Sequence, residues 1–588
     1  MSSFFQTMSA TPTESIPANW RLRLQERVRE LTERNEDQVF LVLTLVIGAL
    51  VGMVVVAFIV VTEGLGEALL PPDGKSWRRI LVPIIGALST GFLLYRYFPE
   101  ARGSGIPQTK AALYAQGGFI SFRTIFGKFF CSSTSLASGI ALGREGPSVH
   151  VGAGIASVLG RTLGLPREKV QSLLPVGSSA ALAAAFNTPI AAVLFALEEV
   201  VGNLHAPVLG SVVLSSATSW LVLRLMLGDE PLFHVPEYQV VHPIEFVIYA
   251  LLGLIGGLVS VLFVKTLLRM RERFLSMPRK TRWVQPAVGG LVVGVMGFFV
   301  PSVLGVGYDS VSDALNGKMA IQVMAILVVL KLIAVTTSYA SGNAGGIFGP
   351  SLFIGAMVGG TVGSVAQFLL PELTATPGAY ALVGMGTAFA GILRVPMTSV
   401  IMIFEITHDY AIIVPLMISN LISFFVSYKL QREPIYEALA MQEGIHLPAA
   451  ETGKRHLQVR LAMHAPSELL SPQLTVAEAL ERGSRSSLSA WPVADEKGVW
   501  GVISLVQLDA ASGEGEGEKK IGDLVESRRF PHVHPDHSLD LALERMGATG
   551  FDLLPVVSRA NVHTLEGVVS LLDVLRAFGV RERRPPDG

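Results

Sequence analysis

The stretch from Trp283 to Tyr428 contains 8 charged residues among its 146. Soluble domains average about 25% charged residues, because their surfaces face water. A charge inside a lipid bilayer costs several kcal/mol, so a chain that crosses a membrane repeatedly avoids charges. The segment from Glu451 to the end is different, with 36 charged residues among 138. We therefore expect a polytopic α-helical membrane protein with a soluble tail.

Composition and missing motifs exclude several other classes of protein. The 46 basic and 47 acidic side chains leave a net charge of -1, and half of the residues are hydrophobic, which excludes a disordered chain and a basic nucleic-acid binder. The single cysteine, Cys131, excludes a disulfide scaffold and a cysteine zinc site. A metalloprotease would need His-Glu-x-x-His, and a magnesium channel would need clustered acids. A serine protease using Ser341 would lack an evident histidine partner.

Apolar segments of two lengths follow one another along the chain. A polar, Arg-rich stretch (residues 1–36) precedes the first apolar run, so we expect no signal peptide. Runs long enough for spanning helices cover 40–61, 79–97, 122–142, 207–228, 243–264, 284–302, 319–338 and 410–428. Shorter runs, broken by Gly and Pro, cover 147–163, 172–186, 189–201, 350–370, 380–393 and 396–407. The basic stretch Lys265–Arg282 is expected to lie in the cytoplasm, and we expect both termini on the same side.

An internal repeat divides the membrane part into two halves. Gly143-Arg-Glu-Gly-Pro-Ser148 recurs in the second half as Gly346-Ile-Phe-Gly-Pro-Ser351, and Pro189 and Glu198 recur at a slightly longer spacing as Pro396 and Glu405. Paired, Gly/Pro-broken apolar segments are typical of transporters with inverted repeats, whose half-helices meet at a binding site near the membrane midplane. Two glycine-rich packing helices are the alternative interpretation. We expect a duplicated, inverted-repeat core of broken helices.

The tail contains a second repeat. Ala479-Leu-Glu-Arg482 recurs as Ala542-Leu-Glu-Arg545, and Gly501-Val-Ile-Ser504 recurs as Gly567-Val-Val-Ser570 at nearly the same spacing. Each copy predicts a helix, two strands and a helix, and a charged, glycine-rich linker (residues 513–518) separates them. The tail is therefore expected to be a tandem α/β pair.

The repeated glycine motifs predict an anion site. Each stands just before an apolar helix, with proline near the first turn, and a helix N-terminus offers free N–H groups and partial positive charge. Two such termini at the midplane would bind an anion without a full positive charge. Glu145 lies at the first motif, where its carboxylate would compete with the anion when ionised and withdraw when protonated. The matching residue, Phe348, is not acidic, so the fold does not require an acid there.

Three loops together resemble the signature of the CLC family of chloride channels and chloride/proton exchangers: Gly103-Ser-Gly-Ile-Pro107, Gly143-Arg-Glu-Gly-Pro147 and Gly345-Gly-Ile-Phe-Gly-Pro350. The resemblance covers roughly residues 40–440. It implies that Ser104, the backbone amides of Ile347 and Phe348, and the hydroxyl of Tyr436 bind chloride, and that Glu145 is the external gate and proton acceptor. The third loop has Phe-Gly-Pro where Phe-Ala-Pro is common. Serine at position 104 favours chloride over nitrate, and the intact first loop argues against fluoride.

The choice between exchanger and channel depends on Glu199. Exchangers of the family often have glutamate at this position as an internal proton relay, and Ile406 occupies the matching place in the second half. We therefore favour secondary active chloride/proton antiport, with a passive voltage- or pH-gated chloride channel as the alternative. Lys128 matches a buried lysine that influences proton coupling, although snorkelling to the interface is an equal alternative. Glu198 pairs with Glu405 through the repeat, so we expect it to have a structural role.

The tail resembles the paired CBS domains that many family members carry. Ser570 and Asp573 match a motif whose hydroxyl and carboxylate hold the ribose of an adenine nucleotide, and a purely structural tail is the alternative. We expect residues 1–36 as a cytoplasmic segment, 37–440 as the membrane domain, 441–460 as a linker, and 461–515 and 519–580 as the two CBS domains. The resemblance also implies a homodimer in the cell (inner) membrane that carries chloride and protons, needs no cofactor or metal, and is not an enzyme.

Overall fold

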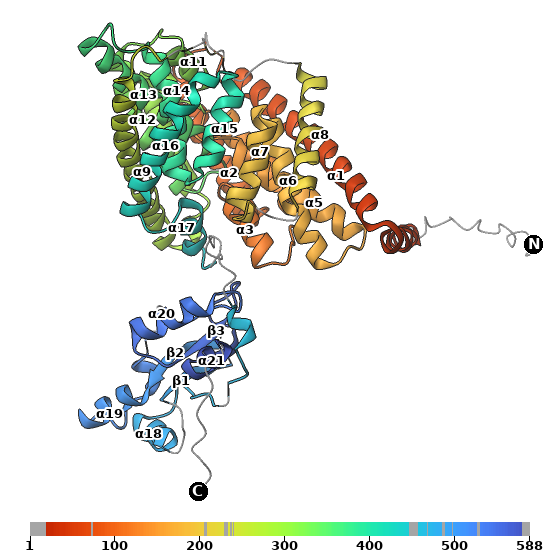
Figure 1. Ribbon diagram of the computed structural model, residues 1–588, viewed down its shortest axis with the longest axis vertical. Helices are drawn as coiled ribbons and strands as arrows, with labels where there is room; N and C mark the ends of the chain where they lie inside the picture. The colour runs from red at the N-terminus through yellow and green to blue at the C-terminus, as the bar shows by residue number, and fades with distance from the viewer. Residues whose placement is uncertain are drawn as a thin grey trace, which may run out of the picture. The chain divides into compact units, whose positions relative to one another are not determined.

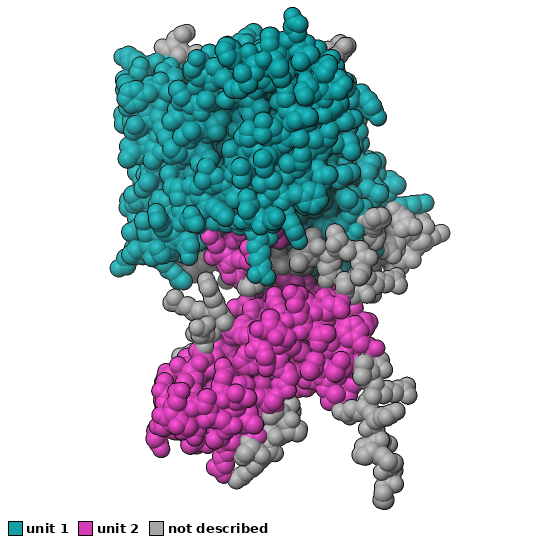
Figure 2. Space-filling view, turned by 60° about the vertical axis from the view of Figure 1, so that its left-hand side comes forward, with its two compact units in different colours: residues 1–113, 117–432 teal, residues 114–116, 433–588 magenta. Residues whose placement is uncertain are grey.

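The computed structural model describes residues 19–71, 74–204, 208–228, 233, 235, 238, 240–445, 457–466, 468–484, 489–496, 498–525 and 530–578, with side chains from residue 38 onward. The chain divides into two compact units (Figure 2). The first contains residues 1–113 and 117–432, and the second contains residues 114–116 and 433–588.

The first unit is helical throughout the part of the chain that the structure describes (Figure 1). Its helices are α1 (Asn19–Leu69), α2 (Arg78–Arg96), α3 (Ile106–Tyr114), α4 (Phe122–Ala137), α5 (Glu145–Thr162), α6 (Arg167–Phe186), α7 (Pro189–Phe195), α8 (Leu209–Leu227), α9 (Glu245–Ser276), α10 (Gln285–Phe299), α11 (Tyr308–Leu315), α12 (Ile321–Ala340), α13 (Phe348–Leu369), α14 (Pro377–Leu393), α15 (Pro396–Thr407) and α16 (Ile413–Leu430). A π-helical turn, Ala196–Val201, continues α7.

Seven segments of the described chain are long and apolar enough to cross a membrane. Shorter apolar helices, α10, α14 and α15, lie among them. Large apolar side chains such as Leu225, Phe299 and Phe368 are largely exposed on the surface of this unit. Apolar side chains exposed in such numbers are expected where lipid, not water, surrounds the protein. The unit is therefore a polytopic membrane domain.

The two halves of the first unit pack in the same way, as the repeat predicts. Helix α5 crosses α6 where Gly152 meets Gly177, and α13 crosses α14 where Gly355 meets Gly384. A Cβ atom on Gly152 would lie 2.3 Å from the carbonyl oxygen of Gly177, and one on Gly355 would lie 2.2 Å from that of Gly384. These glycines recur because only glycine allows the two backbones to approach so closely.

The halves meet through an antiparallel bridge between Gly143 and Gly346. Each of these glycines donates its N–H to the carbonyl oxygen of the other, at 2.7 Å in both directions. Antiparallel pairing of equivalent residues relates the two halves by a local twofold axis. The predicted duplicated core of broken helices is confirmed.

The carboxylates of Glu198 and Glu405 cap helices of the opposite half. Glu198 accepts hydrogen bonds from the backbone N–H of Met397 (3.2 Å) and Thr398 (2.8 Å), at the start of α15. Glu405 accepts from the N–H of Ile190 (2.8 Å) and Ala191 (2.7 Å), at the start of α7. Both helices begin with proline, and neither has a side-chain cap from its own N-terminal residue. The structural role expected for Glu198 is confirmed.

The second unit includes α17 (Ile435–Gln442), followed by two copies of the predicted helix–strand–strand–helix motif. The first copy contains α18 (Val476–Ser484), β1 (Ala490–Asp495), β2 (Gly498–Ser504) and α19 (Leu505–Gly513). The second contains α20 (Leu539–Thr549), β3 (Leu553–Val557), β4 (Leu565–Ser570) and α21 (Leu571–Ala577). Each strand pair is antiparallel, and each has an irregularity at the same repeat position, after Val493 in β1 and after Val556 in β3.

Each copy of the tail completes its core with a residue from outside the boundaries predicted for it. Ile521, which the sequence analysis placed in the second copy, lies in the core of the first copy with Trp491 and Leu508. Val459, which it placed in the linker, lies in the core of the second copy, where its N–H donates to the carbonyl oxygen of His537 at 2.8 Å. The linking segments are therefore part of the folded tail.

Candidate anion site

The N-termini of α5 and α13 share the carboxylate of Glu145. This residue opens α5 and its side chain is fully buried. Its Oε2 accepts a hydrogen bond from the backbone N–H of Gly349, in the first turn of α13, at 3.3 Å. A first-turn N–H has no acceptor within its own helix, so it is available to an anion. The Glu145 carboxylate, at the N-terminus of α5, is therefore an anionic group bound at the N-terminus of α13.

Two residues that sequence reasoning missed surround Glu145. The hydroxyl of Tyr308 donates to Oε1 of Glu145. The guanidinium of Arg144 lies 5.5 Å from the centre of the Tyr308 ring and forms an ion pair with Glu63 at 2.6 Å. Tyr308 follows Gly307, which has a φ of +88°, and glycine adopts that conformation without strain. The segment Gly305-Val-Gly-Tyr308 matches Gly103-Ser-Gly-Ile106 of the first half, with positive φ at both glycines of each, and this match was the signal that sequence reasoning missed.

The three glycine-rich loops converge at Gly146. A Cβ atom there would lie 2.7 Å from the carbonyl oxygen of Ser104 and 3.3 Å from the Cα of Gly346. The side chain of Ser104 is fully buried, and its hydroxyl has no hydrogen-bond partner among the residues that the structure describes. A buried hydroxyl in that state costs free energy unless a ligand accepts its hydrogen bond. The role of the Ser104 hydroxyl in binding chloride stays a prediction.

Ile347 is the residue before α13 and Phe348 is its first residue, so neither N–H group has an acceptor within the helix. The Phe348 ring packs against Phe186, Phe195 and Phe389, with ring centres 4.7, 5.4 and 4.4 Å away. This aromatic cluster, drawn from α6, α7 and α14, fixes the start of α13.

Tyr436 is buried in α17. That helix belongs to the second unit, whereas the other expected chloride ligands belong to the first. The role of the Tyr436 hydroxyl at the chloride site therefore stays a prediction.

Lys128 donates to the carbonyl oxygens of the first loop. Its side chain is fully buried, and Nζ lies 2.9 Å from the oxygen of Gly103 and 3.4 Å from that of Arg102. Snorkelling to the interface is therefore the wrong alternative, because the ammonium points into the protein and is solvated there by backbone oxygens.

Lys331 occupies the position that matches Lys128 in the second half. It is also fully buried, and it donates to the carbonyl oxygens of Val303 (3.1 Å) and Gly305 (2.7 Å). A buried lysine that anchors a loop therefore belongs to both halves, a relation that the sequence analysis missed.

Glu199 forms a buried ion pair with Lys110. The Nζ atom lies 2.9 Å from Oε1, and both side chains are less than a tenth exposed. Lys110 belongs to α3, which begins directly after the loop that holds Ser104. The carboxylate expected to relay protons is thereby connected through one helix to the loop expected to bind chloride.

In the tail, Ser570 and Asp573 bond to each other at the start of α21. The Ser570 hydroxyl and N–H both donate to the Asp573 carboxylate, and Nε2 of His464 lies 3.0 Å from the same oxygen. Burial works to raise the pKa of Asp573, but the hydrogen bonds from Ser570 and the neighbouring His464 outweigh it and hold the pKa below its ordinary value. In the first copy, Ser504 and Gln507 form the same capping box.

Comparisons with known proteins identify the family of this chain. The family model described as "Voltage gated chloride channel" matches residues 85–428, and a CBS domain model matches residues 521–580. The H(+)/Cl(-) exchange transporter ClcA of Vibrio campbellii is 33% identical over 354 residues, which are 59% of this chain and 76% of that protein. The chain therefore belongs to the voltage-gated chloride channel (CLC) family.

Solved structures show the same fold. A slow cyanobacterial Cl-/H+ antiporter matches with a TM-score of 0.63 and 25% identity, over 69% of this chain and 97% of that one. A eukaryotic CLC transporter matches with a TM-score of 0.62 and 21% identity, over 91% and 97%. The chain is a membrane transport protein with a C-terminal CBS domain. Within the described residues, no group of three His, Cys, Asp or Glu side chains is placed to hold a metal ion.

Proposed function

We propose that this chain exchanges chloride for protons across the cell membrane, with Glu145 as its gate. The observation that carries the proposal is the buried Glu145 carboxylate, held by the N–H of Gly349 between two half-helix N-termini. A negative group in that place competes with chloride when ionised. When it is protonated it loses most of its attraction to the N-termini, and chloride takes its place.

Chloride itself is assigned to the buried surroundings of Ser104 and the start of α13. The Ser104 hydroxyl, the N–H groups of Ile347 and Phe348 and the Tyr436 hydroxyl would be its donors. These groups are neutral, so the ion is held weakly enough to leave. The exchangers named among the relatives of this chain support chloride as the substrate.

Protons are assigned to Glu145 on one side and Glu199 on the other. The ion pair with Lys110 holds the Glu199 carboxylate in the π-helical turn that continues α7. Proton movement between the two acids would then be linked to chloride through α3, which joins Lys110 to the Ser104 loop. Lys128 influences this coupling by fixing the Gly103 carbonyl beside Ser104.

The test uses purified full-length protein in liposomes with an outward chloride gradient and a pH electrode outside. We expect uptake of protons against their own gradient, and its loss, with chloride movement kept, in Glu199→Gln. Glu372→Gln, which changes an exposed acid outside the site, is the matched control. Fast chloride efflux without any proton movement in the unmodified protein would show a passive channel and overturn the exchange proposal.

The remaining assignments follow from the same family relation. We propose a homodimer with one pore in each subunit, in the inner membrane with both termini in the cytoplasm. We also propose that Ser570 and Asp573 hold the ribose of an adenine nucleotide. Their carboxylate is already ordered by His464 and Ser570, and equilibrium binding of ATP to the intact protein, compared with Asp573→Ala, tests this. Equal binding by both proteins would leave the capping box as a structural feature only.

A further inference from the structure

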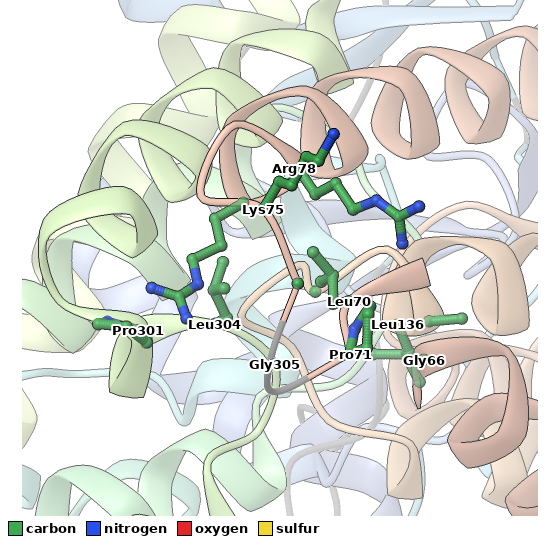
Figure 3. Close-up of a pocket in the computed structure, with 13 residues that line it drawn as sticks. Gly66, Leu70, Pro71, Lys75, Arg78, Leu136, Pro301, Leu304 and Gly305 are labelled. Atoms are coloured by element: carbon green, nitrogen blue, oxygen red, sulfur yellow. The ribbon is translucent and has the colours of Figure 1, made fainter. Parts of the chain in front are cut away.

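A cavity opens in the first unit where α1 ends and α2 begins. Its volume is about 320 Å³, within the range of small-molecule sites, which is about 300–1,000 Å³. Figure 3 shows Lys75 and Arg78 on one side of it and Leu70, Leu136 and Leu304 across from them. Arg79 also lines the cavity. The site therefore has a basic edge and an apolar wall.

The basic edge is available to a ligand. Among the residues that the structure describes, Lys75, Arg78 and Arg79 have no carboxylate within ion-pair distance, and Lys75 is exposed. The Arg78 guanidinium lies over the ring of Trp77, at 5.9 Å, a contact that leaves its N–H groups able to donate. Three neighbouring cations repel one another, and a phosphate group relieves that repulsion through paired N–H···O bonds.

The position of the cavity points to a lipid. It lies at one end of two segments long enough to cross a membrane, α1 and α2, and Trp77 at that end is half exposed, as is typical of the membrane–water boundary. Helices α2 and α10 run antiparallel, because Gly91 approaches Pro286 and Gly294 approaches Ile80. The cavity is therefore at the membrane surface opposite the basic stretch 265–282.

We propose that this cavity binds an anionic phospholipid, with its phosphate on Lys75, Arg78 and Arg79 and the first part of an acyl chain against Leu70, Leu136 and Leu304. The apolar wall favours a lipid over free phosphate, because free phosphate has no apolar part to contact these leucines. A polar head beside a hydrocarbon chain matches both surfaces of the cavity.

Lipid binding would also affect the proposed gate, Glu145, through the chain segment that follows the cavity. Leu304 and Gly305 form part of the cavity wall, and a short way along the chain Tyr308 donates to Glu145. Gly305 is fixed from both sides, because its N–H donates to Gly139 at 2.8 Å and its carbonyl accepts from Lys331 at 2.7 Å. Occupancy of the cavity would hold this segment in place and so stabilise the contact between Tyr308 and Glu145. This last step rests on the proposed gate, whereas lipid binding does not.

The binding test measures how much phosphatidylglycerol stays with the full-length protein. The protein is taken from vesicles of phosphatidylglycerol in excess phosphatidylcholine, washed in detergent and analysed by mass spectrometry. We expect enrichment of phosphatidylglycerol, and a loss of about fivefold for each charge removed in Arg78→Gln/Arg79→Gln, the effect of one basic side chain beside an anionic lipid. The matched control, Arg279→Gln/Lys280→Gln, removes two exposed charges elsewhere and should retain the lipid.

A second variant tests the apolar wall. Gly66 lines the cavity, and a Cβ atom there would meet only Ala137, at 3.8 Å or more, so Gly66→Leu fills the cavity without a clash at Cβ. It should also lose the lipid while eluting as folded protein. Equal retention by wild type and both variants would overturn the proposal. Displacement of the lipid by millimolar inorganic phosphate would overturn the lipid assignment and indicate a free-phosphate site.

The link to the gate has its own readout. Chloride flux of the wild type should differ between vesicles with and without phosphatidylglycerol, and Gly66→Leu should remove the difference. Equal flux in both vesicles, with the lipid still bound, would overturn the link alone. Absence of proton-coupled flux in every lipid would count against the proposed function and leave the binding result standing.

Discussion

Removing the hydroxyl of Tyr308 should strengthen chloride binding. In the structure this hydroxyl donates to the Glu145 carboxylate, which also accepts from Gly349. A hydrogen bond to a charged group contributes about 1.5–3 kcal/mol. If the carboxylate and chloride compete for one position, Tyr308→Phe weakens the carboxylate by that amount. The apparent affinity for chloride should then rise by about 10-fold to 100-fold, since about 1.4 kcal/mol is a factor of ten.

The assay is isothermal titration of chloride into the purified protein near neutral pH. Tyr238→Phe is the matched control, because Tyr238 donates its hydroxyl to the carbonyl oxygen of Leu315, away from Glu145. Its chloride affinity should stay at the wild-type value. In Glu145→Gln, where no charged carboxylate competes, a further Tyr308→Phe change should have no additional effect. An unchanged affinity in Tyr308→Phe, with the protein folded, would refute competition between Glu145 and chloride.

Three further predictions concern stability, each measured by unfolding of the full-length protein. Glu198→Ala and Glu405→Ala should each lower stability by about 1–2 kcal/mol, the usual cost of a lost helix cap. If only one of the two variants is destabilised, the two carboxylates do not cap the opposite halves in the same way. Lys128→Met and Lys331→Met each remove an ammonium that donates to two loop carbonyl oxygens, so we expect both to lower stability by a similar amount, about 1–3 kcal/mol. Loss of proton coupling with unchanged stability in Lys128→Met alone would show a direct coupling role. Burial and the neighbouring Arg559 lower the pKa of His537 to about 2. Below pH ~6.5 the unfolded chain therefore protonates this histidine, whereas the folded tail does not. As the pH falls below ~6.5, the tail should lose up to about 1.4 kcal/mol of stability per pH unit, and His537→Asn should remove this pH dependence.

Much of the architecture could be predicted because the internal repeats are visible in the sequence and mark equivalent helices in the two halves. The short run predicted at 396–407 is α15 with the same bounds, because Pro396 marks the first turn of this helix. The run predicted at 350–370 is α13, which begins slightly earlier, at Phe348, and is long enough to span a membrane. Glycine pairs such as Gly152 and Gly177 were visible as repeats, but their contact across two helices was not.

The surroundings of the site could be predicted only in part. Glu145 and Ser104 belong to motifs that show in a single sequence. Tyr308, by contrast, contacts Glu145 from a distant part of the chain. The sequence around either residue does not predict this contact. The partner of Glu199 was equally hidden, because an ion pair between Lys110 and Glu199 depends on how two helices approach, not on the composition of either.

The exchange of caps between the two halves has a consequence for how the protein is made. When residues 189–201 leave the ribosome, the carboxylate that completes the start of α7 has not been synthesised, because Glu405 belongs to the second half. Two backbone N–H groups of the first half therefore lack this acceptor, inside a membrane, until the second half follows. The final structure of the first half is therefore reached only after the second half has been translated. A ribosome pausing between residues 201 and 396 would leave an incomplete domain open to quality-control proteases.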